Sequence, residues 1–262
     1  MKLSISDIAW SAEQDEAMYG FLRDGGFCGL EIAPTRIFPQ SPYDRLPETR
    51  RFSEKLREEY HLTVSSVQSI WYGRKERIFG TSQERAALLA YTKKAIDFAE
   101  AAGCGNLVFG CPKNRIFEPG SDRAAAVAFF RELGDYAFEK NTVLSMEANP
   151  VLYGTNFINT TPQAFELVKE VGCAGFRVNV DLGTILYNGE GLDPVRQNMD
   201  LVNHIHVSEP GLAAIRERRL HAELADILKS VGYENFVSVE MKNTGDLSAV
   251  REAAEYIRGV FL

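Results

Sequence analysis

The chain has 262 residues, of which 45% are hydrophobic, so it can bury a large core. Its formal net charge of -7 makes nucleic acid an unfavourable partner, because phosphate binding depends on neutralisation by lysine and arginine. No apolar run is long enough to cross a bilayer, and residues 1–7 lack the pattern of a signal peptide. The four cysteines show no metal-type spacing and suit a reducing compartment, so we expect a cytoplasmic protein without a membrane partner.

Short β-rich segments alternate with amphipathic segments along the whole chain. The expected strands lie at residues 2–5, 30–33, 63–69, 106–109, 143–147, 176–181, 204–207 and 237–240. The expected helices lie at residues 13–24, 48–60, 82–102, 122–139, 162–171, 193–199, 221–231 and 247–260. Strict alternation predicts parallel strands with right-handed crossovers, and eight such units predict an α/β fold, a (β/α)8 TIM barrel formed by residues 1–262 as a single domain. The alternative is an open doubly wound sheet, which needs a glycine-rich turn after the first strand that residues 6–10 do not provide.

Four consecutive strands carry a side chain that can bind a metal ion near their C-terminal end. Glu147, Asp181 and Glu240 end the fifth, sixth and eighth strands, and His206 lies in the seventh, two residues after His204 on the same face. The C-terminal ends of barrel strands carry the functional loops, so we expect the four side chains to converge. Three carboxylates and one imidazole suit one divalent cation, with Mn²⁺ or Mg²⁺ favoured over Co²⁺ or Zn²⁺. The alternative is that each carboxylate caps a helix or pairs with a basic residue.

A row of polar side chains stands two residues before each candidate ligand. These residues are Ser145, Asn179, His204 and Ser238. The interior of a structural barrel usually holds branched apolar residues in such a layer. We therefore expect the row to orient the ligands by hydrogen bonds.

These features resemble the xylose isomerase-like TIM barrel superfamily, which includes sugar phosphate isomerases and epimerases, dehydratases and AP endonucleases. The resemblance covers nearly the whole chain, and its specific part is the order Glu, Asp, His, Glu at the ends of strands five to eight. It implies a divalent-metal-dependent isomerase or epimerase of a sugar, sugar phosphate or keto-polyol. In the implied reaction Glu147 and Glu240 are the catalytic residues, which transfer a proton through a metal-stabilised enediolate. The alternatives are a metal-dependent lyase or dehydratase acting on a keto-sugar or cyclitol, and a non-catalytic sugar-binding barrel.

The chain departs from two branches of this superfamily. Ketose 3-epimerases carry a histidine three residues after the aspartate and an arginine six residues after the metal-binding histidine, and both help to hold the sugar. Here these positions are Thr184 and Leu212. The AP endonuclease branch uses further histidines for a three-metal cluster, and a chain with four histidines does not match it.

The predicted loops after the strands supply candidate substrate contacts. They are Trp10, Gln68, Trp71, Asn149, Glu209 and Lys242. The two tryptophans can stack on a sugar face or pack the loops, Glu209 can bind a hydroxyl or hold a ligand, and Lys242 can bind a substrate oxygen or form a salt bridge. Lys113 and Arg115 are weaker candidates for binding a phosphate, since no glycine-rich cradle accompanies them. We expect a small carbohydrate as the partner, and the apolar C-terminal residues 259–262 leave a homo-oligomer open.

Overall fold

Eight parallel strands close into a barrel in the computed structural model, which describes residues 1–262. Each strand pairs with the next along the chain, and β1 pairs with β8. The strands are β1 (Lys2–Ser6), β2 (Gly29–Ile32), β3 (Thr63–Val67), β4 (Leu107–Phe109), β5 (Leu144–Glu147), β6 (Phe176–Asp181), β7 (Val202–Ser208) and β8 (Phe236–Glu240). The predicted (β/α)8 barrel is confirmed, and the open sheet is excluded because no strand lies at an edge.

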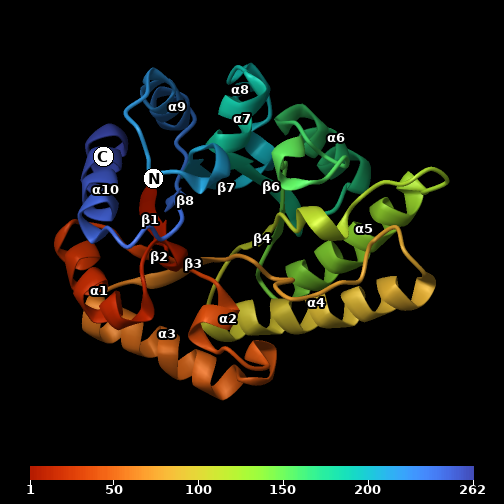
Figure 1. The fold of residues 1–262 in the computed structure, drawn as a ribbon, viewed down its shortest axis with the longest axis horizontal. Helices are drawn as coiled ribbons and strands as arrows, with labels where there is room; N and C mark the ends of the chain where they lie inside the picture. The colour runs from red at the N-terminus through yellow and green to blue at the C-terminus, as the bar shows by residue number, and fades with distance from the viewer.

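The α-helices form a ring around the strands (Figure 1). They are α1 (Asp15–Asp24), α2 (Pro34–Ile37), α3 (Leu46–Tyr60), α4 (Ser82–Ala102), α5 (Arg123–Glu139), α6 (Thr161–Val171), α7 (Leu182–Asn188), α8 (Asp193–Gln197), α9 (Arg219–Ser230) and α10 (Leu247–Phe261). The short helices α2 and α7 were not predicted, and the other eight correspond to predicted helices. None of the helices combines the length and the apolar character that a membrane span requires.

Local signals set the joints between the helices and the strands. Thr81 and Thr160 cap α4 and α6 by accepting a hydrogen bond from a backbone N–H three residues further on, which stabilises each helix by about 1 kcal/mol. The same helices end at Gly103 and Gly172, whose positive φ angles of 66° and 62° a glycine adopts without strain. These glycines turn the chain directly into β4 and β6.

The two faces of the strands differ in chemistry. Leu3 and Ile5 of β1 belong to the hydrophobic core between the strands and the helices, whereas the alternate residues Ser4 and Ser6 are buried polar side chains. The same alternation continues in β8, where Val237 and Val239 join the core. The interior of the barrel is therefore polar over much of its length, which a purely structural barrel does not need.

Candidate metal centre

The four predicted ligands meet at the C-terminal end of the barrel. One ligand atom from each of Glu147, Asp181, His206 and Glu240 lies within 4.8 Å of the others. Nδ1 of His206 is 3.1 Å from Oε2 of Glu147 and 3.3 Å from Oε2 of Glu240. The strand register explains the meeting, because β5 to β8 are neighbours and their C-terminal ends lie on one side of the barrel.

This group of side chains fits a divalent cation. Burial, and then the charge of Glu147, raises the pKa of Asp181 to about 6, and burial raises the pKa of Glu240 to about 7. Three carboxylates held this closely in a buried site repel one another, and a doubly charged ion between them would offset the repulsion. Carboxylate oxygens with one imidazole nitrogen are also the donor set that Mn²⁺ and Mg²⁺ accept.

Two amide side chains fix the carboxylate of Glu147. Asn149 donates from Nδ2 to Oε1 at 2.6 Å, and Asn179 donates from Nδ2 to Oε2 at 2.8 Å. Arg115 in turn donates to Oδ1 of Asn149 at 2.7 Å and to the backbone oxygen of Glu147 at 3.0 Å. The orientation of Glu147 is therefore set by side chains from β6 and from the loop after β5, and Arg115 from the loop after β4 holds the second of these.

Asp181 has two roles in the structure. It is the N-cap of α7, where Oδ1 accepts a hydrogen bond of 2.5 Å from the backbone N–H of Thr184, and it faces the other candidate ligands. Ser208 on β7 also donates to Oδ2. Asp181 therefore caps a helix and also faces the centre. One carboxylate can do both because it has several lone pairs.

Only one of the four residues predicted to orient the ligands makes a hydrogen bond to a carboxylate of the centre. Asn179 donates to Glu147, as the spacing suggests. Ser145 instead donates to Oδ1 of Asn106 at 2.6 Å, and the hydroxyl of Ser238 is buried without a hydrogen-bond partner. His204 pairs with none of the three carboxylates of the centre, because its Nε2 lies 3.1 Å from Glu31 deeper in the barrel.

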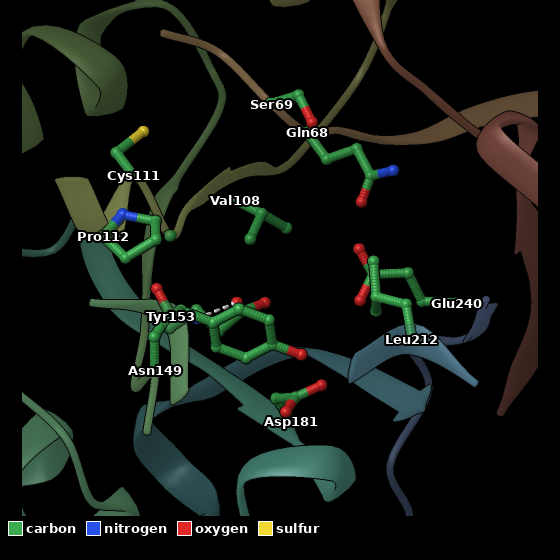
Figure 2. Close-up of a pocket in the computed structure, with 12 residues that line it drawn as sticks. Gln68, Ser69, Val108, Cys111, Pro112, Asn149, Tyr153, Asp181, Leu212 and Glu240 are labelled. Carbon is green, nitrogen blue, oxygen red and sulfur yellow. Dashed lines mark hydrogen bonds between the residues drawn. The ribbon is translucent and has the colours of Figure 1, made fainter. Parts of the chain in front are cut away.

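A cavity that is open to solvent lies directly above the candidate centre (Figure 2). Asp181 and Glu240 point into the same space as Tyr153 and Gln68 in this view. The lining residues are Gln68, Ser69, Val108, Gly110, Cys111, Pro112, Glu147, Asn149, Tyr153, Asp181, Leu212 and Glu240. Three of them are carboxylates, and none is a lysine or an arginine.

Residues 20–260 match the family model described as xylose isomerase-like TIM barrel. The chain belongs to this family. D-psicose 3-epimerase from Enterocloster bolteae (strain ATCC BAA-613) is 29% identical over 123 residues, a segment that spans 45% of this chain and 40% of that relative.

Solved structures from known epimerases have the same fold. A crystal structure of D-psicose 3-epimerase in the presence of D-fructose has a TM-score of 0.79 at 16% identity, and covers 100% of this chain and 99% of that chain. The apo form of 3-keto-D-glucoside 4-epimerase from E. coli has a TM-score of 0.78 at 18% identity, and covers 99% of each chain. At these identities the likeness establishes the fold, and the family match establishes membership of the xylose isomerase-like barrels.

The structure separates the six candidate substrate contacts of this family member into two groups. Gln68 and Asn149 line the cavity. Lys242 is exposed and lies outside the set of lining residues, as does Glu209, which is buried and held by Arg218 through a bidentate ion pair of 2.6 and 2.5 Å. Of the two roles predicted for Glu209, holding a metal ligand is therefore not observed. Its carboxylate holds Arg218 instead.

Trp10 and Trp71 are packed away from the cavity. Trp10 is 2% exposed, and its Nε1 donates to Asp15 at 2.8 Å. Trp71 is 3% exposed, donates from Nε1 to Thr92 at 2.8 Å and packs edge-on against Phe109. Both indoles satisfy their N–H inside the protein, so the structure favours the loop-packing alternative over stacking on a sugar.

Two positions where the family's ketose 3-epimerases have polar residues are closed to such contacts here. Leu212 lines the cavity with an apolar side chain, and Thr184 is buried with its hydroxyl donating to the backbone oxygen of Ala148 at 2.8 Å. Arg115, a candidate for phosphate binding, has no exposed surface and is used to hold Asn149.

One residue of the centre's surroundings was missed by sequence reasoning. Glu31 in β2 is completely buried, and its Oε2 lies 2.9 Å from Nε2 of His206. Carboxylates near the ends of strands five to eight were considered together, whereas this one lies inside the expected second strand, residues 30–33, and was not considered. The same rule applied to every strand would have found it.

Proposed function

We propose that this protein is a divalent-metal-dependent isomerase or epimerase of an uncharged keto-sugar. The observation that carries the proposal is the convergence of four donor atoms within 4.8 Å at the floor of an open cavity. Glu147, Asp181, His206 and Glu240 would hold the cation, which would polarise the sugar carbonyl and stabilise the negative charge that develops on its oxygen. Membership of the xylose isomerase-like family and the partial likeness to D-psicose 3-epimerase support this assignment.

In the proposed reaction Glu147 and Glu240 move the proton. They come from β5 and β8, with the two other ligand strands between them, and each has an oxygen close to Nδ1 of His206. One carboxylate takes the proton from the carbon next to the carbonyl, which gives an enediolate. If the other carboxylate returns a proton to the opposite face of that carbon, the product is an epimer. If the proton is returned to the former carbonyl carbon, the product is the aldose or ketose isomer.

The charge of the cavity favours a sugar without phosphate. Its lining contains three carboxylates and no basic side chain, so one cation leaves a net negative site. A unit negative charge about 6 Å from one uncompensated carboxylate is disfavoured by about 3 kcal/mol at an effective dielectric constant of about 20. We expect kcat/KM for D-fructose to exceed that for D-fructose 6-phosphate by roughly a hundredfold, if D-fructose is a substrate. The opposite order would contradict the proposed charge selection.

The wall of the cavity differs from that of the ketose 3-epimerases in the family. Leu212 and Val108 present apolar surface to the substrate, which suits the carbon-bound hydrogens of a sugar face. Gln68, Ser69, Asn149 and Tyr153 supply uncharged polar side chains to the lining. We infer that the sugar hydroxyls are held by uncharged polar groups of this lining rather than by a histidine and an arginine.

Solvent proton exchange tests the reaction. The protein loaded with Mn²⁺ is incubated with a panel of ketoses in D₂O, and the sugars are analysed by proton NMR and mass spectrometry. An isomerase or epimerase exchanges one carbon-bound proton for deuterium and yields a product with the same carbon skeleton and formula. Glu147→Gln and Glu240→Gln are expected to abolish exchange, and Glu223→Gln, which removes a surface carboxylate paired with Arg219, is the matched control.

The same experiment separates the alternatives. A lyase or dehydratase gives a product lighter by the eliminated group, which would replace the proposed isomerisation. A sugar-binding barrel shows ligand binding, unchanged in Glu147→Gln, and no exchange with any sugar. The oligomeric state, which the sequence leaves open, is independent of these outcomes and is checked by the mass of the protein in solution.

A further inference from the structure

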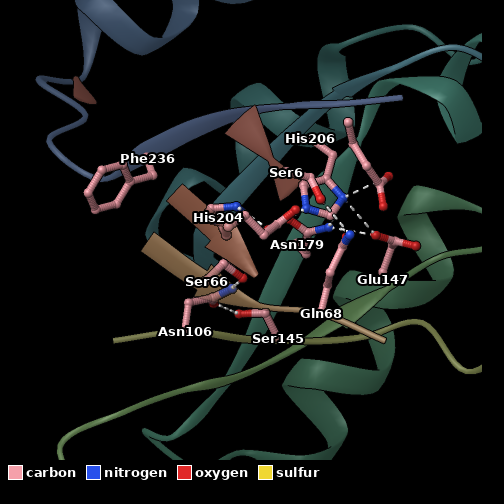
Figure 3. A network of polar contacts seen from close by, with 12 residues as sticks. Ser6, Ser66, Gln68, Asn106, Ser145, Glu147, Asn179, His204, His206 and Phe236 are labelled. Atoms are coloured by element: carbon pink, nitrogen blue, oxygen red, sulfur yellow. Dashed lines mark hydrogen bonds and ion pairs between the residues drawn. The ribbon is translucent and has the colours of Figure 1, made fainter. Parts of the chain in front are cut away.

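Glu31 connects the candidate metal centre to the interior of the barrel. It lies in β2, across the barrel from β7, and has no exposed surface. Its Oε2 is 2.9 Å from Nε2 of His206 and 3.1 Å from Nε2 of His204. Figure 3 shows these histidines in a network of polar side chains that includes Asn179, Gln68 and Glu147.

The contact with Glu31 determines which nitrogen of His206 can bind a cation. Nδ1 faces the carboxylates of Glu147 and Glu240, whereas Nε2 faces Glu31. A neutral imidazole carries one N–H and one lone pair. Because a carboxylate only accepts hydrogen bonds, Glu31 selects the form with the hydrogen on Nε2, which leaves the lone pair of Nδ1 directed at the centre.

Gln68 extends the influence of Glu31 to a second ligand. When the amide oxygen of Gln68 accepts the hydrogen bond from Ser6 at 2.6 Å, its nitrogen lies 2.7 Å from Oε1 of Glu240 and 3.1 Å from Oε1 of Glu31. This orientation satisfies all three contacts, whereas the opposite one places the amide oxygen against two carboxylates. A single side chain therefore joins Glu31 to Glu240.

We propose that Glu31 is the positioning residue of the metal centre: it orients His206 directly and Glu240 through Gln68. This inference rests on the proposed function, because it takes His206 and Glu240 as metal ligands. Glu31 does not line the cavity, so it acts on the ligands and not on the substrate. The competing role is purely structural, in which Glu31 does no more than offset the burial of two neighbouring histidines.

Metal binding without substrate distinguishes these roles. The dissociation constant for Mn²⁺ is measured by calorimetry, and the absorption spectrum of the Co²⁺-loaded protein reports the coordination geometry. Glu31→Gln is expected to weaken Mn²⁺ binding about 10- to 100-fold and to change the Co²⁺ spectrum.

Asp7→Asn is the matched control, because Asp7 is another carboxylate without exposed surface. It accepts a hydrogen bond from the backbone of Ala33 at 3.0 Å and lies 3.6 Å from Arg36, outside the centre. This variant is expected to change the melting temperature and to leave the Mn²⁺ dissociation constant within about twofold of the unaltered protein, since it removes no partner of a ligand.

Gln68→Leu tests the second connection and replaces Glu31→Gln if that variant does not fold. It is expected to weaken Mn²⁺ binding about tenfold. A folded Glu31→Gln variant with unaltered Mn²⁺ affinity and Co²⁺ spectrum overturns the inference, as does unaltered affinity in Gln68→Leu when Glu31→Gln is unfolded. If the unaltered protein binds none of Mn²⁺, Mg²⁺ or Co²⁺, the proposed function falls as well, so the two failures are distinguishable.

Discussion

Replacing Arg115 by methionine tests how the end of β5 is held in place. The guanidinium group is completely buried, and burial lowers its pKa to about 10. Its Nη2 donates to the backbone oxygen of Glu147 at 3.0 Å and to Oδ1 of Asn149 at 2.7 Å. Arg115→Met leaves both oxygens without a donor, at about 1 to 3 kcal/mol each, while removal of a buried charge offsets part of this loss. We expect the free energy of unfolding to fall by about 2 to 4 kcal/mol.

Urea denaturation with EDTA present measures this change without a contribution from bound metal. Arg115→Lys keeps the charge but not the two-pronged geometry, so it should lose stability as well. Arg131→Met removes an exposed arginine with one contact of 3.5 Å to the backbone of Glu170, and should change stability by less than about 0.5 kcal/mol. An Arg115→Met variant that is as stable as the unaltered protein would refute the reasoning, since it would show that neither oxygen needs the guanidinium.

Three further variants test separate features. Asp181→Asn keeps a good N-cap for α7, so its stability in EDTA should stay within about 1 kcal/mol, while calorimetry should show Mn²⁺ binding at least about tenfold weaker; equal affinity would leave Asp181 with the capping role alone. Trp71→Ala should lower the unfolding free energy by about 3 to 5 kcal/mol with little change in KM, and a raised KM at unchanged stability would restore the stacking role. Burial lowers the pKa of His221 to about 4, so stability is complete above about pH 6.5 and falls by about 3 kcal/mol as the pH drops to 4, because the unfolded state takes up the proton first. Urea titrations at pH 7 and pH 4.5 should show most of this loss absent from His221→Gln, and an equal loss in both proteins would contradict it.

The sequence predicts the barrel well because its signals are repeated and local. Each β-rich run follows a helix that ends at a glycine, as at Gly103 and Gly172, and strict alternation leaves few topologies open. The helix α7 was missed because it begins at Leu182, directly after the strand residue Asp181 that caps it. No loop separates the two elements, so the strand pattern and the helix pattern meet without a turn signal between them.

The sequence predicted the candidate ligands better than the substrate contacts, because the ligands lie on strands and most of the substrate contacts lie on loops. A strand fixes the direction of every second side chain, so Glu147 and Glu240 were placed by counting residues alone. A loop gives no such rule, and Trp71 turns into the core, where Thr92 satisfies its N–H. Residue type therefore predicts chemistry on a strand, but on a loop the partner of each polar atom has to be known first.

The support of the candidate centre follows from the closed shape of the barrel. The four ligands come from β5 to β8, which are consecutive in the sequence and therefore visible as an ordered motif. Their outer contacts come partly from the first half of the chain, where Glu31 meets His206 and Gln68 meets Glu240. Only closure through β1 and β8 brings these halves together across a polar interior, so no spacing in the sequence reveals the contacts. A polar interior lacks the apolar packing of an ordinary barrel. Orientation of the metal ligands by Glu31 and Gln68 gives a reason for this polar interior.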